Sequence, residues 1–199
     1  MPKKFICGND PDEKIISRCI EVLENHGVIL LPTETVYGLV CRFGDDIAED
    51  KIYRLKHRPQ DKRLSVFVDD IAKLSPYGVE FSPLCWQMAM EYCPGAITLI
   101  TARNGNSSIG FRIPDHDFVL KLLKAVNFPL SSTSANRSGM PNVLNPEQAV
   151  AELDGEVDII IDGGSIAEGA LASTVVDCRG EKAVILRQGA LIINNKFTS

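Results

Sequence analysis

The stretch of residues 12–32, DEKIISRCIEVLENHGVILLP, holds the helix-to-strand step that decides the fold. Its apolar residues recur at helical spacing, which predicts an amphipathic helix over residues 12–26. Gly27 ends that helix, and residues 28–31 follow at once as an unbroken apolar run, typical of a strand buried on both faces. Pro32 ends the strand because proline cannot donate to a sheet ladder. A helix that leads directly into a buried strand favours an α/β fold.

The same alternation of helical and strand patterns continues along the chain. Further helices are predicted over residues 47–56, 83–92, 118–126 and 146–153. Further strands are predicted over residues 64–68, 97–101, 109–113, 129–131, 157–161, 174–177 and 183–187. This order predicts an open, twisted, mixed sheet flanked by helices. Because no repeat or linker rich in Gly, Pro and Ser divides the chain, we expect residues 1–199 to form a single domain with a frayed tail over residues 190–199.

Composition limits the classes of protein that need to be considered. A chain of 199 residues with 45% hydrophobic and 24% charged residues is an ordinary folded protein with room for one substantial core. Its net charge of -5 argues against a general basic surface for nucleic acid, so any phosphate recognition must be local.

The cysteines and the apolar runs bear on the compartment. The six cysteines include no CxxC pair, so we interpret them as reduced thiols and predict no metal site. The start of the chain lacks the apolar stretch of a secretion signal, and the apolar runs are too short to cross a bilayer. We therefore expect a soluble cytoplasmic protein with no membrane contact.

A basic segment, residues 56–63 with the sequence KHRPQDKR, is the first candidate for a binding site. Pro59 breaks the preceding helix, so Arg58, Lys62 and Arg63 are predicted to lie on a turn. Crowded cations favour a nearby anion, and the segment therefore indicates a phosphate site. The alternative is a solvated helix end whose cations complement the helix dipole.

Other polar clusters fall at the ends of predicted strands, where open α/β sheets place their ligands. They are residues 32–39, 131–139 and 172–177, and Arg112 and Arg187 end two further strands. The serine-rich run at 131–139 offers hydroxyl groups and a backbone anion nest, or else forms a polar turn capped by its own hydroxyls.

Glutamate and histidine residues are the other candidates for chemistry. Glu34, between two threonines, is either a working carboxylate or half of a structural salt bridge. The isolated residues His26, His57 and His116 match no zinc motif. The chain also has neither GxxxxGK[ST] nor GxGxxG, so a nucleotide would need a different cradle.

Seven motifs in order resemble the YrdC/TsaC family of L-threonylcarbamoyladenylate synthases. They are PTETVYGL at 32–39, KxR at 56–58, PGAIT at 94–98, GFRIP at 110–114, STSANRSG at 132–139, STVVD at 173–177 and LRQG at 186–189. The resemblance implies a twisted α/β sheet with a positively lined central cavity. It also implies an enzyme that joins L-threonine, bicarbonate and ATP, with Mg²⁺, to give threonylcarbamoyl-adenylate and pyrophosphate. The product would pass to tRNA threonylcarbamoyl-transfer proteins that modify adenosine 37 of ANN-decoding tRNAs.

The resemblance also implies roles for individual residues. The threonine-binding residues would be Thr35, Arg112, Ser132 and Ser173. The ATP-binding residues would be Arg58, Lys62, Ser108, Ser134, Asn142 and Arg187. Lys56 and Arg58 would carry the catalytic charge, because an N-carboxylate must approach an anionic phosphate without any covalent nucleophile.

Departures from the family pattern leave some roles open. Arg63 stands where the family usually has proline, and we interpret it as the least involved member of the basic segment. Phe67 stands where some members have histidine. The length resembles the short bacterial type without an extra C-terminal domain. Two alternatives remain, namely a non-catalytic double-stranded RNA-binding module with weak RNA affinity and an enzyme that forms carbamoyl-adenylate.

Overall fold

The structure, a computed structural model, describes residues 2–6 and 13–198. Its helices are α1 (Glu13–Glu24), α2 (Asp46–Lys56), α3 (Pro83–Tyr92), α4 (Asp117–Val126) and α5 (Pro146–Glu152), with 3-10 turns at Ile71–Tyr77 and Asn195–Phe197. Its strands are β1 (Lys3–Ile6), β2 (Ile29–Leu31), β3 (Gly38–Arg42), β4 (Ser65–Phe67), β5 (Val79–Glu80), β6 (Ile97–Arg103), β7 (Ser107–Arg112), β8 (Leu130–Ser134), β9 (Ile159–Asp162), β10 (Thr174–Asp177) and β11 (Val184–Arg187). These elements alternate along the chain as the sequence predicts.

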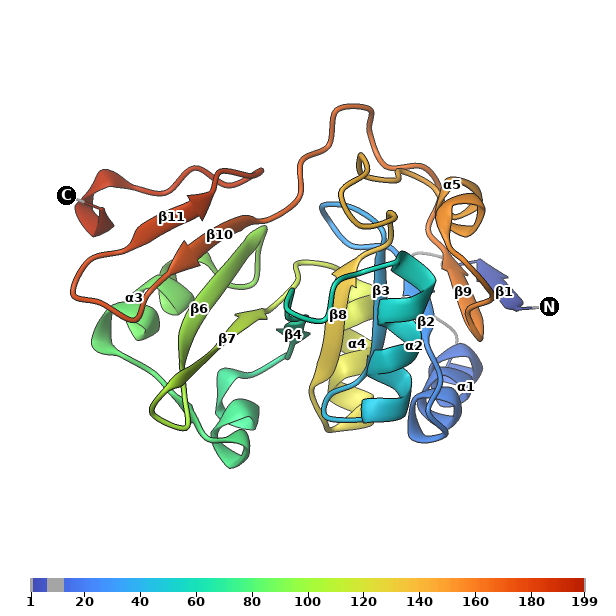
Figure 1. Cartoon of the computed structure of the whole chain (residues 1–199), viewed down its shortest axis with the longest axis horizontal. Coiled ribbons are helices and arrows are strands. Elements are labelled where there is room, and N and C mark those ends of the chain that lie inside the picture. The colour runs from blue at the N-terminus through green and yellow to red at the C-terminus, as the bar shows by residue number, and fades with distance from the viewer. Residues whose placement is uncertain (1, 7–12, 199) are drawn as a thin grey trace.

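All described strands belong to one mixed sheet (Figure 1). The order across it is β1-β9-β2-β3-β8-β4-β7-β6-β10-β11, with β5 paired to β6. Parallel pairs such as β4 with β7 and β6 with β10 sit beside antiparallel pairs such as β3 with β8. The predicted open, mixed α/β sheet is therefore confirmed.

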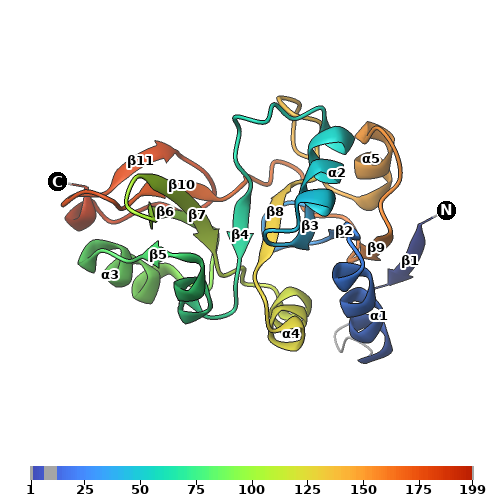
Figure 2. The same ribbon diagram turned by 60° about the horizontal axis from the view of Figure 1, so that its bottom comes forward.

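Helices cover the two faces of the sheet unequally (Figure 2). Apolar side chains of α1 and α4 pack against one face of the half that contains β2, β3, β8 and β9, and those of α2 and α5 pack against its other face. The half formed by β6, β7 and β10 packs against α3 on one face. Among residues 2–6 and 13–198, no helix packs on the opposite face of that half, and this open face becomes the floor of a cavity.

Local signals explain how α2 leads into the basic segment. The Asp45 side chain accepts a hydrogen bond from the backbone nitrogen of Ala48 and caps the N-terminus of the helix. At the other end His57 adopts φ 48°, a left-handed conformation that ends the helix. The chain therefore turns sharply just where its cations gather.

Three strands of the sheet, β1, β3 and β5, were not predicted, and the prediction for the tail needs correction. Strand β3 was not predicted, because Gly38 and Leu39 were assigned to a polar cluster, yet β3 is buried between β2 and β8 in the middle of the sheet. The tail that we expected to fray instead packs on the core through Ile193 and Phe197, and the Phe197 carbonyl accepts a hydrogen bond from the Ala183 nitrogen. Residue 12, the predicted start of the first helix, lies outside the described residues.

Candidate active site

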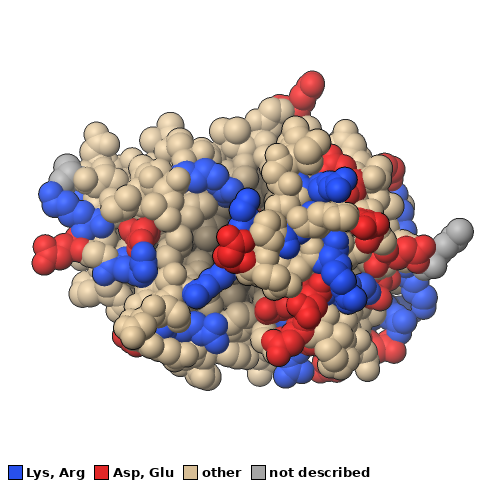
Figure 3. All heavy atoms as spheres, in the orientation of Figure 1, with Lys and Arg blue, Asp and Glu red and all other residues tan. Residues whose placement is uncertain are grey.

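A cavity of about 370 Å³ lies on the open face of the sheet, where β4, β7 and β6 meet β8 and the loop before β3. Figure 3 shows this hollow near the middle of the molecule, with Lys and Arg side chains gathered around it. Its wall brings together side chains that are far apart in the sequence, from Thr33 to Arg187.

The two-residue period of the strands decides which side chains face the cavity. On β6, Ile97 and Leu99 are buried in the core, while Thr98 and Ile100 line the cavity. On β7, Ile109 and Phe111 face the core, while Ser108, Gly110 and Arg112 face the cavity. Alternation therefore sends polar residues to the site and apolar residues to the core.

Four arginines, Arg58, Arg63, Arg112 and Arg187, line the cavity, and among the described residues no aspartate or glutamate does. Burial lowers the pKa of Arg187, and the nearby charge of Arg112 lowers it further. Burial also lowers the pKa of Arg58. Crowded guanidinium groups on a wall without described carboxylates are chemically suited to a multiply charged anion.

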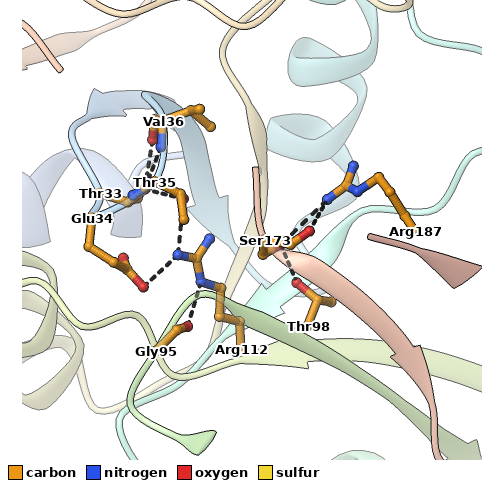
Figure 4. A network of polar contacts seen from close by, with 9 residues as sticks. All are labelled: Thr33, Glu34, Thr35, Val36, Gly95, Thr98, Arg112, Ser173 and Arg187. Carbon is orange, nitrogen blue, oxygen red and sulfur yellow. Dashed lines mark hydrogen bonds and ion pairs between the residues drawn. The ribbon is translucent and has the colours of Figure 1, made fainter. Parts of the chain in front are cut away.

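Arg112 is held by three groups at the end of β7 (Figure 4). Its Nε donates to the Gly95 carbonyl at 3.2 Å, and its Nη2 donates to Thr35 Oγ1 at 3.0 Å. The same Nη2 lies 2.6 Å from Glu34 Oε1 in an ion pair whose side chains are only 6% and 19% exposed. Glu34 is thus a partner of Arg112 inside the protein and does not line the cavity.

The loop that carries Glu34 and Thr35 is held by its own side chains. Thr33 Oγ1 donates to the Val36 carbonyl at 2.7 Å and accepts from the backbone nitrogens of Thr35 and Val36 at 3.2 Å. This polar turn fixes the Thr35 hydroxyl beside Arg112. Thr33 itself lines the cavity, although its role was not predicted.

A second polar group lies across the cavity (Figure 4). Arg187 Nη2 donates to the Ser173 carbonyl at 2.8 Å, and the hydroxyl groups of Ser173 and Thr98 lie 2.8 Å apart. Ser173 and Thr98 are both buried. The structure therefore places Ser173 and Arg187, predicted from separate motifs, in one cluster.

Ser132 and Ser134 bring the serine-rich run to the same wall. The hydroxyl of Ser132 lies 2.9 Å from that of Ser65, which is on the neighbouring strand β4. Ser108 reaches the wall from β7. Three predicted ligands from β7 and β8 therefore line the same cavity.

Lys56 does not reach the cavity, contrary to the predicted phosphate contact. Its side chain is 1% exposed, and its Nζ donates to the carbonyls of Ser134 and Asn136. Burial and the charge of Arg58 lower the pKa of Lys56 to about 7. The spacing contains a signal for this position, since Lys56 follows buried Ile52 by four residues and so shares the inner face of α2.

The rest of the basic segment is divided between the cavity and its surroundings. Arg58 lines the cavity and also supports the turn, donating from Nε to the Lys62 carbonyl at 2.9 Å. Lys62 is exposed and does not line the cavity, and His57 pairs with Asp154 at 3.0 Å. Arg63, predicted to be the least involved, lines the cavity.

Asn142 also lies outside the cavity lining, with its Nδ2 3.5 Å from the Ala170 carbonyl. That contact joins the segment after β8 to the loop between β9 and β10. The structure thus brings seven predicted ligands to one wall and leaves four, namely Lys56, Lys62, Thr35 and Asn142, behind or beside it.

No metal site appears in the part of the chain that the structure describes, where no three His, Cys, Asp or Glu residues gather to hold an ion. The five described cysteines, Cys19, Cys41, Cys85, Cys93 and Cys178, are free thiols, and Cys7 lies outside the described residues. Within residues 2–6 and 13–198, no helix is long and apolar enough to cross a membrane.

Fold and cavity together define an α/β protein with an arginine-lined cavity. The sequence model of the Sua5/YciO/YrdC family, described as "Telomere recombination", matches residues 21–189, and the chain belongs to this family.

Relatives of two lengths match the chain. It is 33% identical over 193 residues to the threonylcarbamoyl-AMP synthase of Bacillus subtilis, covering 92% of this chain and 55% of the relative. It is 30% identical over 198 residues to an uncharacterized protein of Haemophilus influenzae, covering 94% of both chains. The chain thus spans about half the length of the Bacillus synthase.

A solved structure shares the fold of this chain. The crystal structure of P. abyssi Sua5 complexed with L-threonine superposes with a TM-score of 0.85 at 27% identity, covering 95% of this chain and 57% of that one. That relative holds an amino acid.

Proposed function

We propose that this chain synthesises L-threonylcarbamoyladenylate from L-threonine, bicarbonate and ATP, with release of pyrophosphate. The observation that carries the proposal is a cavity wall with four arginines, several hydroxyl groups and no described carboxylate. Such a wall suits two anionic substrates that must be brought together. The synthase name of a relative and the threonine in a similar structure favour this reaction among those that use anions.

Threonine would bind on the side of Arg112. The guanidinium is planar and held on one edge by Gly95, Thr35 and Glu34, which suits it to present a fixed fork to a carboxylate. The hydroxyl groups of Ser132 and Ser173 would complete that subsite.

ATP would bind on the side of Arg58 and Arg187, with Ser108 and Ser134 beside them. Lys62 and Asn142 would complete the subsite only if their segments moved toward the ligand. Lys56 would act as a positioning residue, because its ammonium group holds the Ser134 and Asn136 carbonyls from behind the wall.

The reaction joins the two subsites. The threonine amine, after losing a proton to solvent, bonds to the carbon of bicarbonate; the N–C bond forms, a C–O bond of bicarbonate breaks with loss of water, and an N-carboxylate results. An oxygen of that carboxylate then attacks the α-phosphorus of ATP, and the bond to pyrophosphate breaks. Arginines offset the repulsion between the anions and stabilise charge on the leaving group, so positioning and electrostatics supply the catalysis.

Magnesium, implied by the family resemblance, does not fit a protein-held site among the described residues. The cavity lining offers hydroxyl groups but no carboxylate, and oxygen ligands with negative charge are what Mg²⁺ usually takes from proteins. We assign no residue to it. Synthesis in the cytoplasm and transfer of the product to tRNA-modifying proteins also belong to the proposal.

The test is formation of a threonine-linked AMP product from labelled threonine. Product that requires threonine, bicarbonate and ATP, with pyrophosphate formed in equal amount, is expected. Carbamoyl-adenylate formed from carbamoyl phosphate and ATP without threonine would instead identify a carbamoyl-adenylate enzyme. Tight binding of double-stranded RNA with no turnover under any of these conditions would identify a binding module.

A further inference from the structure

The turn between α2 and β4 places a guanidinium group at the cavity that the family resemblance does not assign. Arg63 ends this turn and lines the cavity, although its side chain is largely exposed. The turn is fixed by Arg58, which donates from Nε to the Lys62 carbonyl at 2.9 Å and from Nη2 to the Arg63 carbonyl at 2.8 Å. The backbone of Arg63 is thus held by another cavity arginine.

The side chain of Arg63 is held as well. Its Nη1 donates to the Ser108 carbonyl on β7 at 2.7 Å. No other described residue forms a hydrogen bond or an ion pair with this guanidinium, so its Nε and Nη2 donors remain available. A guanidinium group that is held at one nitrogen and has two free nitrogens can make a bidentate contact with a phosphate.

The charge of Arg63 is also uncompensated within the described part of the chain. Arg58 and Arg187 line the same cavity, and burial already lowers the pKa of both. Arg112 also lines this cavity, so Arg63 is a fourth cation there. It raises the electrostatic cost of the cavity, and an anion with several charges relieves that cost.

From these contacts we infer that Arg63 binds the terminal phosphates of the nucleotide and gives the site its preference for a triphosphate. The inference rests on the proposed function, which sets the orientation of the nucleotide in the cavity. There the α-phosphorus must meet the amino-acid substrate beside deeply buried Arg112, which is 5% exposed. The outer phosphates then extend toward exposed Arg63.

The experiment measures binding of ATP, ADP and AMP by calorimetry, without threonine, to the wild-type protein, Arg63→Gln and Arg63→Lys. For Arg63→Gln we expect about tenfold weaker ATP binding, a smaller loss for ADP and none for AMP, because only ATP carries the outermost phosphate. The ATP affinity of Arg63→Gln should also depend less on salt. Arg63→Lys should be intermediate, since it keeps the charge but loses the fork.

Arg54→Gln is the matched control. It removes the same charge from an exposed position on α2 that does not line the cavity, and it should bind all three nucleotides like the wild-type protein. Equal losses for ATP, ADP and AMP in Arg63→Gln would show that Arg63 only supports the turn, and no loss would show that it is a bystander. Either result overturns the inference.

The outcomes also separate this inference from the proposed function. If the wild-type protein forms no threonine-linked product, but Arg63→Gln loses the preference for ATP over ADP and AMP, then the inference about Arg63 holds and the proposed function fails. If the wild-type protein forms the product, and Arg63→Gln has the same KM for ATP as the wild type, then the proposed function holds and the inference about Arg63 fails.

Discussion

Arg112 and Glu34 form an ion pair inside the protein, with 2.6 Å between Nη2 and Oε1. The second carboxylate oxygen of Glu34 is buried and has no hydrogen-bond partner among the described residues. The Glu34 carboxylate therefore interacts with the same Arg112 guanidinium that we propose binds the carboxylate of threonine. Of the two interpretations open from the sequence, the structural salt bridge is the one observed.

Two substitutions of Glu34 should have opposite effects on threonine affinity. Glu34→Gln keeps an oxygen for Arg112 but removes the competing negative charge, so threonine should bind about fivefold tighter, since charge interactions are strong at partly buried sites. Glu34→Ala removes the contact that orients Arg112, so threonine should bind more weakly. Calorimetric titration with threonine distinguishes them, and weaker binding in both variants would contradict the charge argument.

Loss of this ion pair should also reduce stability. Removing one partner of a buried pair leaves the other charge uncompensated, so the free energy of unfolding of Glu34→Gln should fall by about 3 kcal/mol. Urea denaturation gives this value. The control is Glu91→Gln on α3, which breaks a more exposed pair with Lys196 in the C-terminal 3-10 turn, and a change of less than about 1 kcal/mol is expected there.

Lys56 should make stability depend on pH. The folded-state pKa is lowered to about 7 from an ordinary value of 10.5, so between these values the unfolded chain binds more protons than the folded one. The free energy of unfolding of the wild-type protein should therefore rise with pH above 7, relative to Lys56→Met, by up to about 1.4 kcal/mol per pH unit.

Urea denaturation of both proteins at several pH values from 6.5 to 9.5 measures that difference. Parallel curves would mean that the Ser134 and Asn136 carbonyls stabilise the ammonium form enough to cancel the effect of burial. The outcome thus reports the protonation state of the group that holds this loop.

Phe197 should anchor the C-terminal segment. It is 7% exposed and packs edge-on near Tyr92 of α3, with 5.9 Å between ring centroids. Phe197→Ala should lower the free energy of unfolding by about 3 kcal/mol, because it leaves a cavity in the core. Ile192→Ala, at a position 83% exposed, should change it by less than about 0.5 kcal/mol. Equal stability of Phe197→Ala and wild type in thermal unfolding would mean that the tail is frayed, as the sequence predicts.

Chelation should weaken ATP binding only modestly. Because the described cavity lining contributes no carboxylate, a change from Mg²⁺ to EDTA should alter the ATP dissociation constant by less than about tenfold. Calorimetry in the two buffers measures this change. A loss greater than a hundredfold would reveal protein ligands for the ion that the wall does not show.

Much of the architecture was determined by the sequence alone. Helix α3 and strand β10 have the predicted bounds, because the apolar period, the Ser82 cap and the flanking breaks are all local signals. The alternation on β6 and β7 likewise predetermined that Thr98 and Ser108 face away from the apolar core. Strand β3 was missed because its Gly38 weakens the strand signal.

Only the tertiary structure decided which cations serve the cavity. The four basic residues from Lys56 to Arg63 share one short segment and one sign of charge. Lys56 lies on the inner face of α2 and donates to the Asn136 carbonyl, whereas Arg63 donates to the Ser108 carbonyl at the cavity wall. Side chains on a turn, such as those of Arg58 and Arg63, have no repeating period to fix their direction. Contacts with strands that lie far away in the sequence set that direction, and so the division between support and binding was decided by the fold.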